Sequence, residues 1–354
     1  MLAFAGAGFA QQAKEPPKRQ PIRVATPFEV SSSPAGNYLS ALIAGADRDT
    51  HAAATFAREA LRYDRRNKEL IERAFVASLS NGDMREAFGI GERLARLDPK
   101  NGLVNLALGA RSFKNKQFAN ARNDISRGGG GRQRDLTVAL LTAWTYAGAG
   151  DARRGLEALE KLKDERFASF RDYHMGLMAD IAGNAGEAQK RLKAAYEAEK
   201  TSLRIADNWA RFLARRGDKD EAKKVYEAYD QIAPRHPLVT AALADLAAGK
   251  SLENPIPNAV AGAGEVFYQL GAVGSQQNDS FAAMIYLRMA LYLAPENALG
   301  IITLADIYER LKQYERAIDV YETVPAKSPL RGNAEIQSAL ILEAMGKSDD
   351  ALKH

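Results

Sequence analysis

The segment LGIITLADIYERLKQYERAIDVYETVPAKSP, residues 299–329, contains two amphipathic stretches joined by a short polar turn. Ala305 and Tyr308 lie on one face of the first stretch at helical spacing, which predicts a helix over 299–311. The second stretch repeats this spacing and predicts a helix over 314–324. A single hairpin of this size cannot bury both apolar faces by itself. The segment therefore predicts one unit of a stack of helical hairpins.

The same spacing recurs along most of the chain, in two series set twelve residues apart and with most intervals equal to 34 residues. The first series is Phe75, Gly109, Ala143, Gly176, Ala210, Gly271, Ala305 and Ala339, and the second is Ala87, Ala121, Gly155, Ala188, Ala222, Ala283, Ala317 and Ala351. Small residues at these positions let neighbouring helices approach closely. Because Phe75 is large, we expect looser packing in its unit.

This pattern resembles the tetratricopeptide repeat family, whose units combine two small residues, two aromatic residues and a closing proline. All five positions match in one unit, at Ala305, Tyr308, Ala317, Tyr321 and Pro329. Four match in another, at Ala210, Ala222, Tyr226 and Pro234. The resemblance covers roughly residues 35–354. It implies an all-α fold, namely a right-handed α-solenoid of stacked helical hairpins.

One interval breaks the period, because Ala210 and Gly271 are 61 residues apart. We expect one degenerate unit near 238–262, since the proline-interrupted stretch 249–257 prevents a normal second helix. Asn258 can cap the helix that follows. We expect a change in the curvature of the solenoid at this point.

The sequence predicts five segments along the chain. They are a signal-peptide remnant at 1–10, a proline-rich linker at 11–34, an array of about six repeats at 35–234, a degenerate repeat at 235–263, and an array of about three repeats at 264–354 with an incomplete last unit. The first ten residues are apolar and end in Gly8-Phe9-Ala10, which is typical of the end of a secretory signal.

Three further stretches, at 235–239, 290–295 and 328–337, resemble exported, uncharacterised multi-repeat proteins of Gram-negative bacteria. That resemblance implies a longer chain and a periplasmic or envelope-associated location, with the cytoplasm as the alternative. It also allows a peripheral association with the membrane or with an envelope complex. It implies no reaction.

The composition excludes several classes of function. There is no cysteine, so disulfides, thiolate metal sites and a cysteine nucleophile are excluded. The net charge of +5 comes from 49 basic and 44 acidic residues of interspersed sign, which argues against a nucleic-acid partner. No metal-ligand spacing is found among His51, His174, His236 and His354. The glycine run 128–131 lacks the residues of a phosphate loop. We expect no cofactor, no metal and no enzymatic activity.

In such arrays the first helix of each unit lines the concave face. Positions three before, one after and four after its small residue point into the groove. This rule and its near neighbours give ten candidate partner-binding residues, namely Leu140, Trp144, Phe170, Tyr173, Leu177, Arg204, Asp207, Arg211, Arg215 and Tyr268. Aromatic side chains beside a row of arginines suit a peptide with apolar and acidic residues. Alternatively, Trp144 and Tyr173 pack between layers and the arginines form a solvated face.

The sequence therefore predicts a non-enzymatic scaffold that binds a protein or peptide in its concave groove. One alternative is the substrate-presenting repeat segment of a longer enzyme, such as a glycosyltransferase. A second alternative is RNA binding by a related 35-residue helical repeat, which the 34-residue spacing and the modest charge argue against.

Overall fold

The computed structural model describes residues 30–128 and 132–353, so the predicted segment 1–10 and most of 11–34 lie outside it, as do Gly129–Gly131 of the glycine run. The described residues form nineteen α-helices and one 3₁₀ helix, with no strand. The helices are α1 Pro34–Ala46, α2 Thr50–Tyr63, α3 Lys68–Asn81, α4 Met84–Leu97, α5 Gly102–Lys114, α6 Phe118–Arg127, α7 Arg132–Gly148, α8 Ala152–Glu160, η1 Glu165–Phe167, α9 Ala168–Ile181, α10 Ala185–Ala198, α11 Leu203–Arg215, α12 Lys219–Ile232, α13 Pro237–Ala247, α14 Ala259–Gln276, α15 Ser280–Leu293, α16 Ala298–Arg310, α17 Tyr314–Tyr321, α18 Arg331–Ala344 and α19 Ser348–Ala351.

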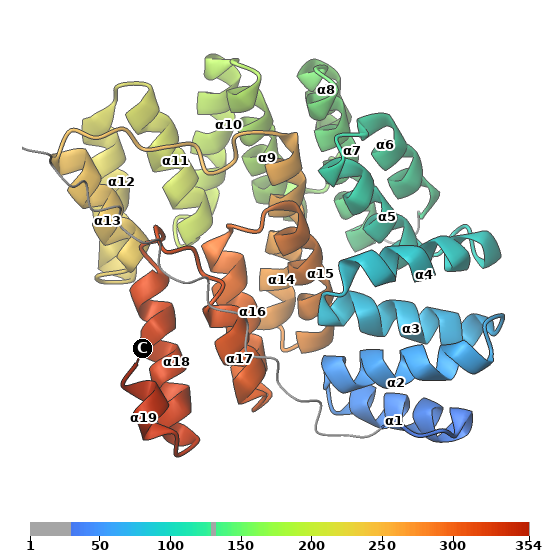
Figure 1. The fold of residues 1–354 in the computed structure, drawn as a ribbon. Coiled ribbons are helices and arrows are strands. Elements are labelled where there is room, and N and C mark those ends of the chain that lie inside the picture. Colours follow the sequence, from blue (N-terminus) through green and yellow to red (C-terminus); the bar gives the residue numbers. More distant parts are fainter. Residues whose placement is uncertain (1–29, 129–131, 354) are drawn as a thin grey trace, which may run out of the picture.

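Consecutive helices pair as hairpins, and the hairpins stack side by side, so the predicted all-α solenoid is confirmed (Figure 1). The six hairpins from α1 to α12 form an arc, which we call the N-terminal array. The three hairpins from α14 to α19 form a second stack, the C-terminal array. Helix α17 ends at Tyr321, three residues before the end predicted from the sequence.

The small residues of the repeat lie where facing helices touch. A Cβ added to Gly109, Gly176 or Gly271 would come within 2.6–2.7 Å of a leucine or isoleucine on the second helix of the same hairpin. The expectation of loose packing around Phe75 is wrong, because its side chain is only 1% exposed. Gly91 on the facing helix α4 provides the space for this side chain, because a Cβ at Gly91 would lie 3.1 Å from the Phe75 ring. A bulky residue on one helix is thus accommodated by a glycine on the other.

The turn inside each hairpin contains one residue with left-handed backbone, and this residue recurs with the period of the repeat. These residues are Arg48, Gly82, Lys116, Gly150, Gly183, Gly217, Asn278, Lys312 and Gly346. The left-handed conformation is unfavourable for a residue that has a Cβ, whereas glycine adopts it without this penalty. Arg48, Lys116, Asn278 and Lys312 therefore hold strained turns that the packing of the hairpins imposes.

Replacing Lys312 (φ 59°) with glycine is expected to raise the free energy of unfolding by about 1 kcal/mol, because the strain of the turn is removed. Gly217→Ala is the matched substitution, and it should change the stability in the opposite direction. Its φ is 90° and no atom lies within 4 Å of an added Cβ, so backbone strain alone should lower stability by about 1 kcal/mol. Chemical denaturation measures both changes. If both substitutions raised the free energy of unfolding, or both lowered it, the assignment of strain to the turn would be contradicted.

The degenerate unit consists of α13 followed by an extended stretch. Residues 248–258 contain no helix, yet Leu252 and Ile256 are almost completely buried. Asn258 ends the stretch by accepting hydrogen bonds from the amides of Val260 and Ala261, both at 3.0 Å, as the sequence predicts. The stretch carries the chain from α13 across α11 to the start of α14 (Figure 1).

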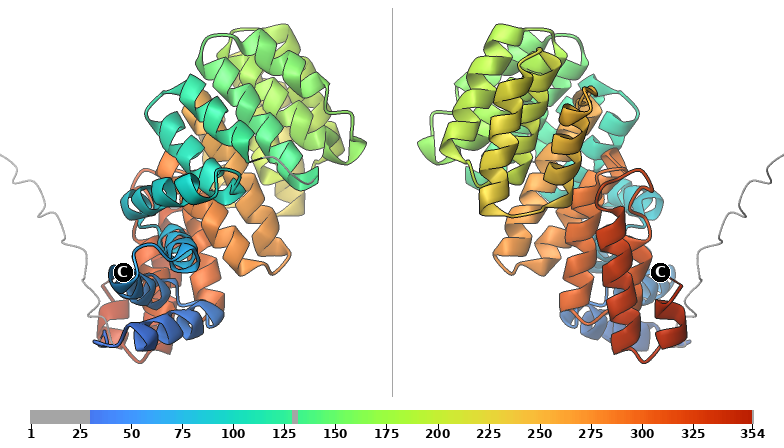
Figure 2. Two further views of the ribbon diagram at one scale, coloured as in Figure 1. Left: turned by 90° about the vertical axis from the view of Figure 1, so that its right-hand side faces the viewer. Right: turned by 90° about the vertical axis from the view of Figure 1, so that its left-hand side faces the viewer.

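After this crossing the chain turns back on itself, at the place where the sequence predicts a change in curvature. Helices α14 to α17 lie inside the arc of the N-terminal array (Figures 1 and 2). Helix α14 packs against α5, α7 and α9, and α15 packs against α3 and α5. The C-terminal array thus occupies the concave side of the N-terminal array.

The described helices include none that combines the length and the apolar character needed to cross a lipid bilayer.

Candidate functional site

The predicted groove residues of the N-terminal array lie on its concave side, but they are covered. Leu140, Trp144, Tyr173 and Leu177 are each at most 2% exposed. Helix α14 covers them, and the contact is so close that a Cβ on Gly262 would lie 2.4 Å from the Trp144 ring. The expectation of an open groove at these positions is wrong, because the groove is filled by the same chain.

A buried ion pair fixes α14 in the groove. The Glu265 side chain is 0% exposed and faces the Arg204 guanidinium, with Nη2 to Oε2 at 2.7 Å and Nε to Oε1 at 2.9 Å. The Tyr173 hydroxyl donates to Glu265 Oε1 at 2.9 Å and accepts from Asn208 Nδ2 at 2.8 Å. Arg204 also lies over the ring of Tyr268, with 5.6 Å from Cζ to the ring centroid. Residues 92 positions apart in the sequence are thus joined in one network.

The same network shifts the pKa values of its members. Burial raises the pKa of the Tyr173 hydroxyl well above its ordinary value, and the charge of Glu265 adds to that shift. Burial alone would lower the pKa of Arg204, but the charge of Glu265 and its hydrogen bonds raise it instead. Tyr173 therefore stays neutral and Arg204 stays charged, as a stable contact between the two arrays requires.

His174 forms a second contact between the arrays. Its Nδ1 accepts a hydrogen bond from Trp144 Nε1 at 3.1 Å, and its Nε2 lies 3.0 Å from Gln269 Oε1 on α14. The indole can only donate, so His174 carries its proton on Nε2 and donates to Gln269. Burial lowers the pKa of His174 to about 4. The contact between the two arrays therefore contains the neutral imidazole of His174.

Lowering the pH from about 7 to about 4 is expected to reduce the free energy of unfolding by about 3 kcal/mol through His174. Its folded pKa of about 4 lies below the ordinary value of 6.5, so the unfolded chain binds the proton first. The contribution of neutral His174 to the free energy of unfolding is therefore complete above pH 6.5 and is lost as the pH falls toward 4. His174→Gln, measured by urea denaturation across this range, should show a flatter pH dependence. A slope equal to that of the wild type would contradict this role.

The arginines of the predicted row form ion pairs within the chain. Arg211 pairs with Asp207 at 2.8 Å and donates to the carbonyl of Glu253 in the crossing stretch at 3.3 Å. Arg215 pairs with Asp180. The Arg211 and Arg215 side chains are only 19% and 22% exposed, so they do not form a solvated face. A contact between the row and a peptide stays a prediction.

Helices α15 to α17 continue the contact toward the first hairpins. Tyr292 meets Phe88 edge to face at 5.1 Å between ring centroids. The Tyr308 hydroxyl lies 3.3 Å from Thr50 Oγ1, and Arg316 donates to Asn81 Oδ1 at 2.5 Å. The two arrays thus touch along most of the groove.

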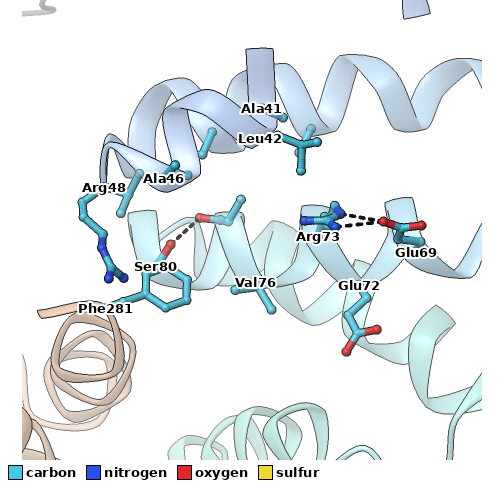
Figure 3. A pocket seen from close by; sticks show the side chains of 15 residues that line it. Ala41, Leu42, Ala46, Arg48, Glu69, Glu72, Arg73, Val76, Ser80 and Phe281 are labelled. Carbon is cyan, nitrogen blue, oxygen red and sulfur yellow. Dashed lines mark hydrogen bonds and ion pairs between the residues drawn. The ribbon is translucent and has the colours of Figure 1, made fainter. Parts of the chain in front are cut away.

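Hollows remain beside this contact among the described residues. One, of about 460 Å³, lies between α1 to α3 and is bounded at its inner end by Phe281 of α15, with Arg48 against the Phe281 ring (Figure 3). Its walls are mostly apolar, including Leu42 and Val76, and its outer rim carries Glu69 paired with Arg73.

The other hollow, of about 530 Å³, opens between α9, α11 and α12 of the N-terminal array and α14 and α16 of the C-terminal array. Four of the ten predicted residues line it, namely Phe170, Tyr173, Arg204 and Tyr268. The structure therefore gathers these four around one opening. Leu140, Trp144 and Leu177 are buried under α14 instead.

This second hollow borders a further surface, which helices α14, α16 and α18 of the C-terminal array contribute to. The register rule that gave the first groove, applied to α14, α16 and α18, defines it. Its members are Tyr268, Ala272 and Ser275 on α14, Ile302, Asp306 and Glu309 on α16, and Ile336, Leu340 and Glu343 on α18. We call this set the open face. Of these positions only Tyr268 is among the ten predicted residues, although the same register in the sequence marks the others.

The open face combines exposed apolar side chains with carboxylates. Ile336 and Leu340 are 59% and 58% exposed. Asp306 and Glu309 both accept from the hydroxyl of Tyr321, at 2.5 and 3.1 Å. Burial raises the pKa of Asp306 despite that hydrogen bond. Over residues 30–128 and 132–353, no ion pair involves Asp306, Glu309 or Glu343, although Arg310 lies beside them and donates to Ser275 at 2.7 Å.

Nothing in the described part of the chain resembles a metal centre, since no cluster of three or more histidine or acidic side chains is suited to hold an ion. His51 and His236 are half-buried, and burial lowers the pKa of each. His236 accepts a hydrogen bond from the amide of Leu238 at the start of α13. His236 thus caps the start of α13.

Comparisons with known proteins give one family match and several distant structural similarities. A search of the curated proteins finds no match. Among solved structures, the chain is similar to the anaphase-promoting complex hetero-tetramer Cut9-Hcn1, with 15% identity and a TM-score of 0.36 over 86% of this chain and 55% of that one. It is also similar to Naa15/Naa10 bound to HypK-THB, with 16% identity and a TM-score of 0.34 over 90% of this chain and 62% of that one. The P58(IPK) TPR domain is 14% identical, with a TM-score of 0.26 over 90% of this chain and 98% of that one.

The chain thus spans just over half the length of the Cut9-Hcn1 chain that it matches. A family model matches directly within α16 and α17, over residues 301–324. That segment contains Ala305, Tyr308, Ala317 and Tyr321, which carry the pattern seen in the sequence. Residues 301–324 are therefore identified as a tetratricopeptide repeat, within a solenoid whose other hairpins keep its spacing.

Proposed function

We propose that this protein is a non-enzymatic scaffold that binds a protein or peptide ligand on its open face. The observation that carries the proposal is a difference in burial between matched positions. Leu140 and Trp144 are 2% and 0% exposed because α14 covers them. Ile336 and Leu340 occupy the same register positions on α18 and are more than half exposed. The N-terminal groove already has its occupant, whereas the open face has room for one.

The predicted site residues divide between these two surfaces. Tyr268 begins the apolar row of the open face, and the hollow beside it is lined by Phe170, Tyr173 and Arg204. A ligand on the open face would therefore lie beside this hollow, in whose wall Tyr173 is fully buried. The covered residues support the site indirectly, because they hold α14 in place.

The test compares two pairs of exposed apolar residues with the same spacing. Ile336→Asp with Leu340→Asp should abolish specific capture of a ligand from a whole-cell extract while the helix content stays unchanged. Leu39→Asp with Ile43→Asp is the matched control, since these α1 residues are 58% and 63% exposed and do not belong to the open face. Quantitative mass spectrometry of the cross-linked ligands gives the readout. Loss in both variants, or in neither, would refute the open face as the binding surface.

We also propose that the protein works in the bacterial envelope, at the periplasmic side. The support is the apolar segment 1–10, which has the small residues of a cleavage site, together with the resemblance to exported repeat proteins. Cell fractionation followed by N-terminal sequencing tests this. A mature protein beginning near Gln11 in the periplasmic fraction is expected, and an intact Met1 on a cytosolic protein would rule it out.

A further inference from the structure

We propose that the ligand of the open face is a segment of another protein that combines lysine or arginine with aliphatic side chains. This inference rests on the function proposed above and adds the chemistry of the partner. It follows from how the chain recognises its own helix in the first groove and from the charges that remain unpaired in the second.

The first groove shows how these surfaces select an occupant. Its apolar positions, such as Trp144 and Leu177, are covered by the apolar side of α14. Its charged position on α11 is Arg204, and the occupying helix supplies Glu265 directly opposite at 2.7 Å. Burial of apolar surface thus comes with a charge of the opposite sign, because a buried charge without a partner is costly.

The open face carries an acidic side chain at one position where α11 of the first groove carries an arginine. Asp306 occupies the register position of Trp144 and Arg211, and Glu309 and Glu343 lie three residues further along their helices. Asp306 is partly buried; among the described residues it accepts a hydrogen bond from the Tyr321 hydroxyl and forms no ion pair, although the charge of nearby Arg310 acts to lower its pKa. Arg310 is directed to Ser275. A cationic side chain from a ligand would therefore complete the site.

The apolar part of the face limits the ligand further. Ile302, Ile336 and Leu340 lie at neighbouring register positions of α16 and α18, and the row continues to Tyr268 at the hollow. Burial of the two exposed side chains favours a ligand with aliphatic groups between its basic residues. A purely cationic polymer would leave these side chains in water.

The experiment measures binding of defined peptides to the full chain. One fluorescent peptide of about a dozen residues alternates leucine and lysine, and its twin has glutamate in place of every lysine. The lysine peptide is expected to bind about tenfold more tightly than its twin, with an affinity that falls as salt is added.

Variants locate this binding. Asp306→Asn with Glu309→Gln and Glu343→Gln should weaken the lysine peptide about tenfold. A matched control removes the same charge from exposed carboxylates elsewhere, through Asp64→Asn, Glu165→Gln and Glu296→Gln, and should change the affinity less than twofold, or about 0.4 kcal/mol.

Equal weakening by both triple variants would overturn the inference, because the attraction would then depend on net charge alone. Tight binding of the glutamate twin that is lost in Ile336→Asp with Leu340→Asp would also overturn it, while leaving the proposed scaffold intact. Failure of both peptides would overturn the inference, and the scaffold itself would then be judged by the capture experiment. Residues 11–29 of this chain are basic and proline-rich. If a peptide of that sequence binds more tightly than the lysine peptide, the occupant is this chain itself, and an external partner is refuted.

Discussion

Replacing Glu265 with alanine is expected to lower the free energy of unfolding by about 3–5 kcal/mol. The change removes the partner of Arg204, whose side chain is only 15% exposed, and leaves a buried positive charge without compensation. It also removes the acceptor of the Tyr173 hydroxyl. Because this network joins α9, α11 and α14, hydrogen exchange should accelerate first in α14.

An exposed ion pair of similar length is the control for this prediction. Arg153 and Glu157 are 2.6 Å apart, but their side chains are 82% and 51% exposed. Glu157→Ala should therefore cost less than about 1 kcal/mol. The double variant Arg204→Leu with Glu265→Leu should recover most of the loss, since neither charge remains buried. If Glu265→Ala costs no more than Glu157→Ala in urea denaturation, the ion pair does not hold the arrays together.

Replacing Gly262 with valine is expected to detach α14 from the groove or to destabilise the protein by more than about 3 kcal/mol. Even a single added Cβ would lie 2.4 Å from Trp144, far inside contact distance. The indole cannot move aside easily, because it is fully buried and its Nε1 is bonded to His174. Small-angle scattering should report a larger radius of gyration, and Trp144 should become accessible to fluorescence quenchers.

Gly89 provides the matched control for the crowding argument. It lies within helix α4, and an added Cβ there would meet no atom within 4 Å. Gly89→Ala should therefore raise stability by up to about 1 kcal/mol, as alanine generally does in a helix. If Gly262→Val is as stable and as compact as Gly89→Ala, the close approach of α14 to Trp144 is not needed for the fold.

The sequence predicted the hairpins well because their determinants are local. The spacing of Ala305, Tyr308 and Ala317 fixes two helices and their contact within one unit. The same register rule placed Leu140 and Trp144 on the concave side of the N-terminal array, where they lie. Such determinants repeat every 34 residues, so even one clear unit allows the others to be aligned.

The occupied groove could not be predicted in this way. Glu265 and Arg204 are 61 residues apart, and their meeting depends on the path of residues 248–258, which follow no repeat pattern. The irregular 61-residue interval marked the place of the turn but not its direction. Phe75 shows the same limit on a smaller scale, because its accommodation depends on Gly91 in the facing helix. The envelope location and the ligand stay predictions.

The contact between the two arrays also has a mechanical consequence. In an ordinary solenoid each repeat contacts only its neighbours, so the solenoid can extend and bend elastically. Here α14 and α15 pack against α3, α5, α7 and α9, so they connect several repeats that are not neighbours in the sequence. The protein should therefore resist extension and unfold in few, large steps under tension, and it would present its ligand at a fixed angle instead of adapting to it.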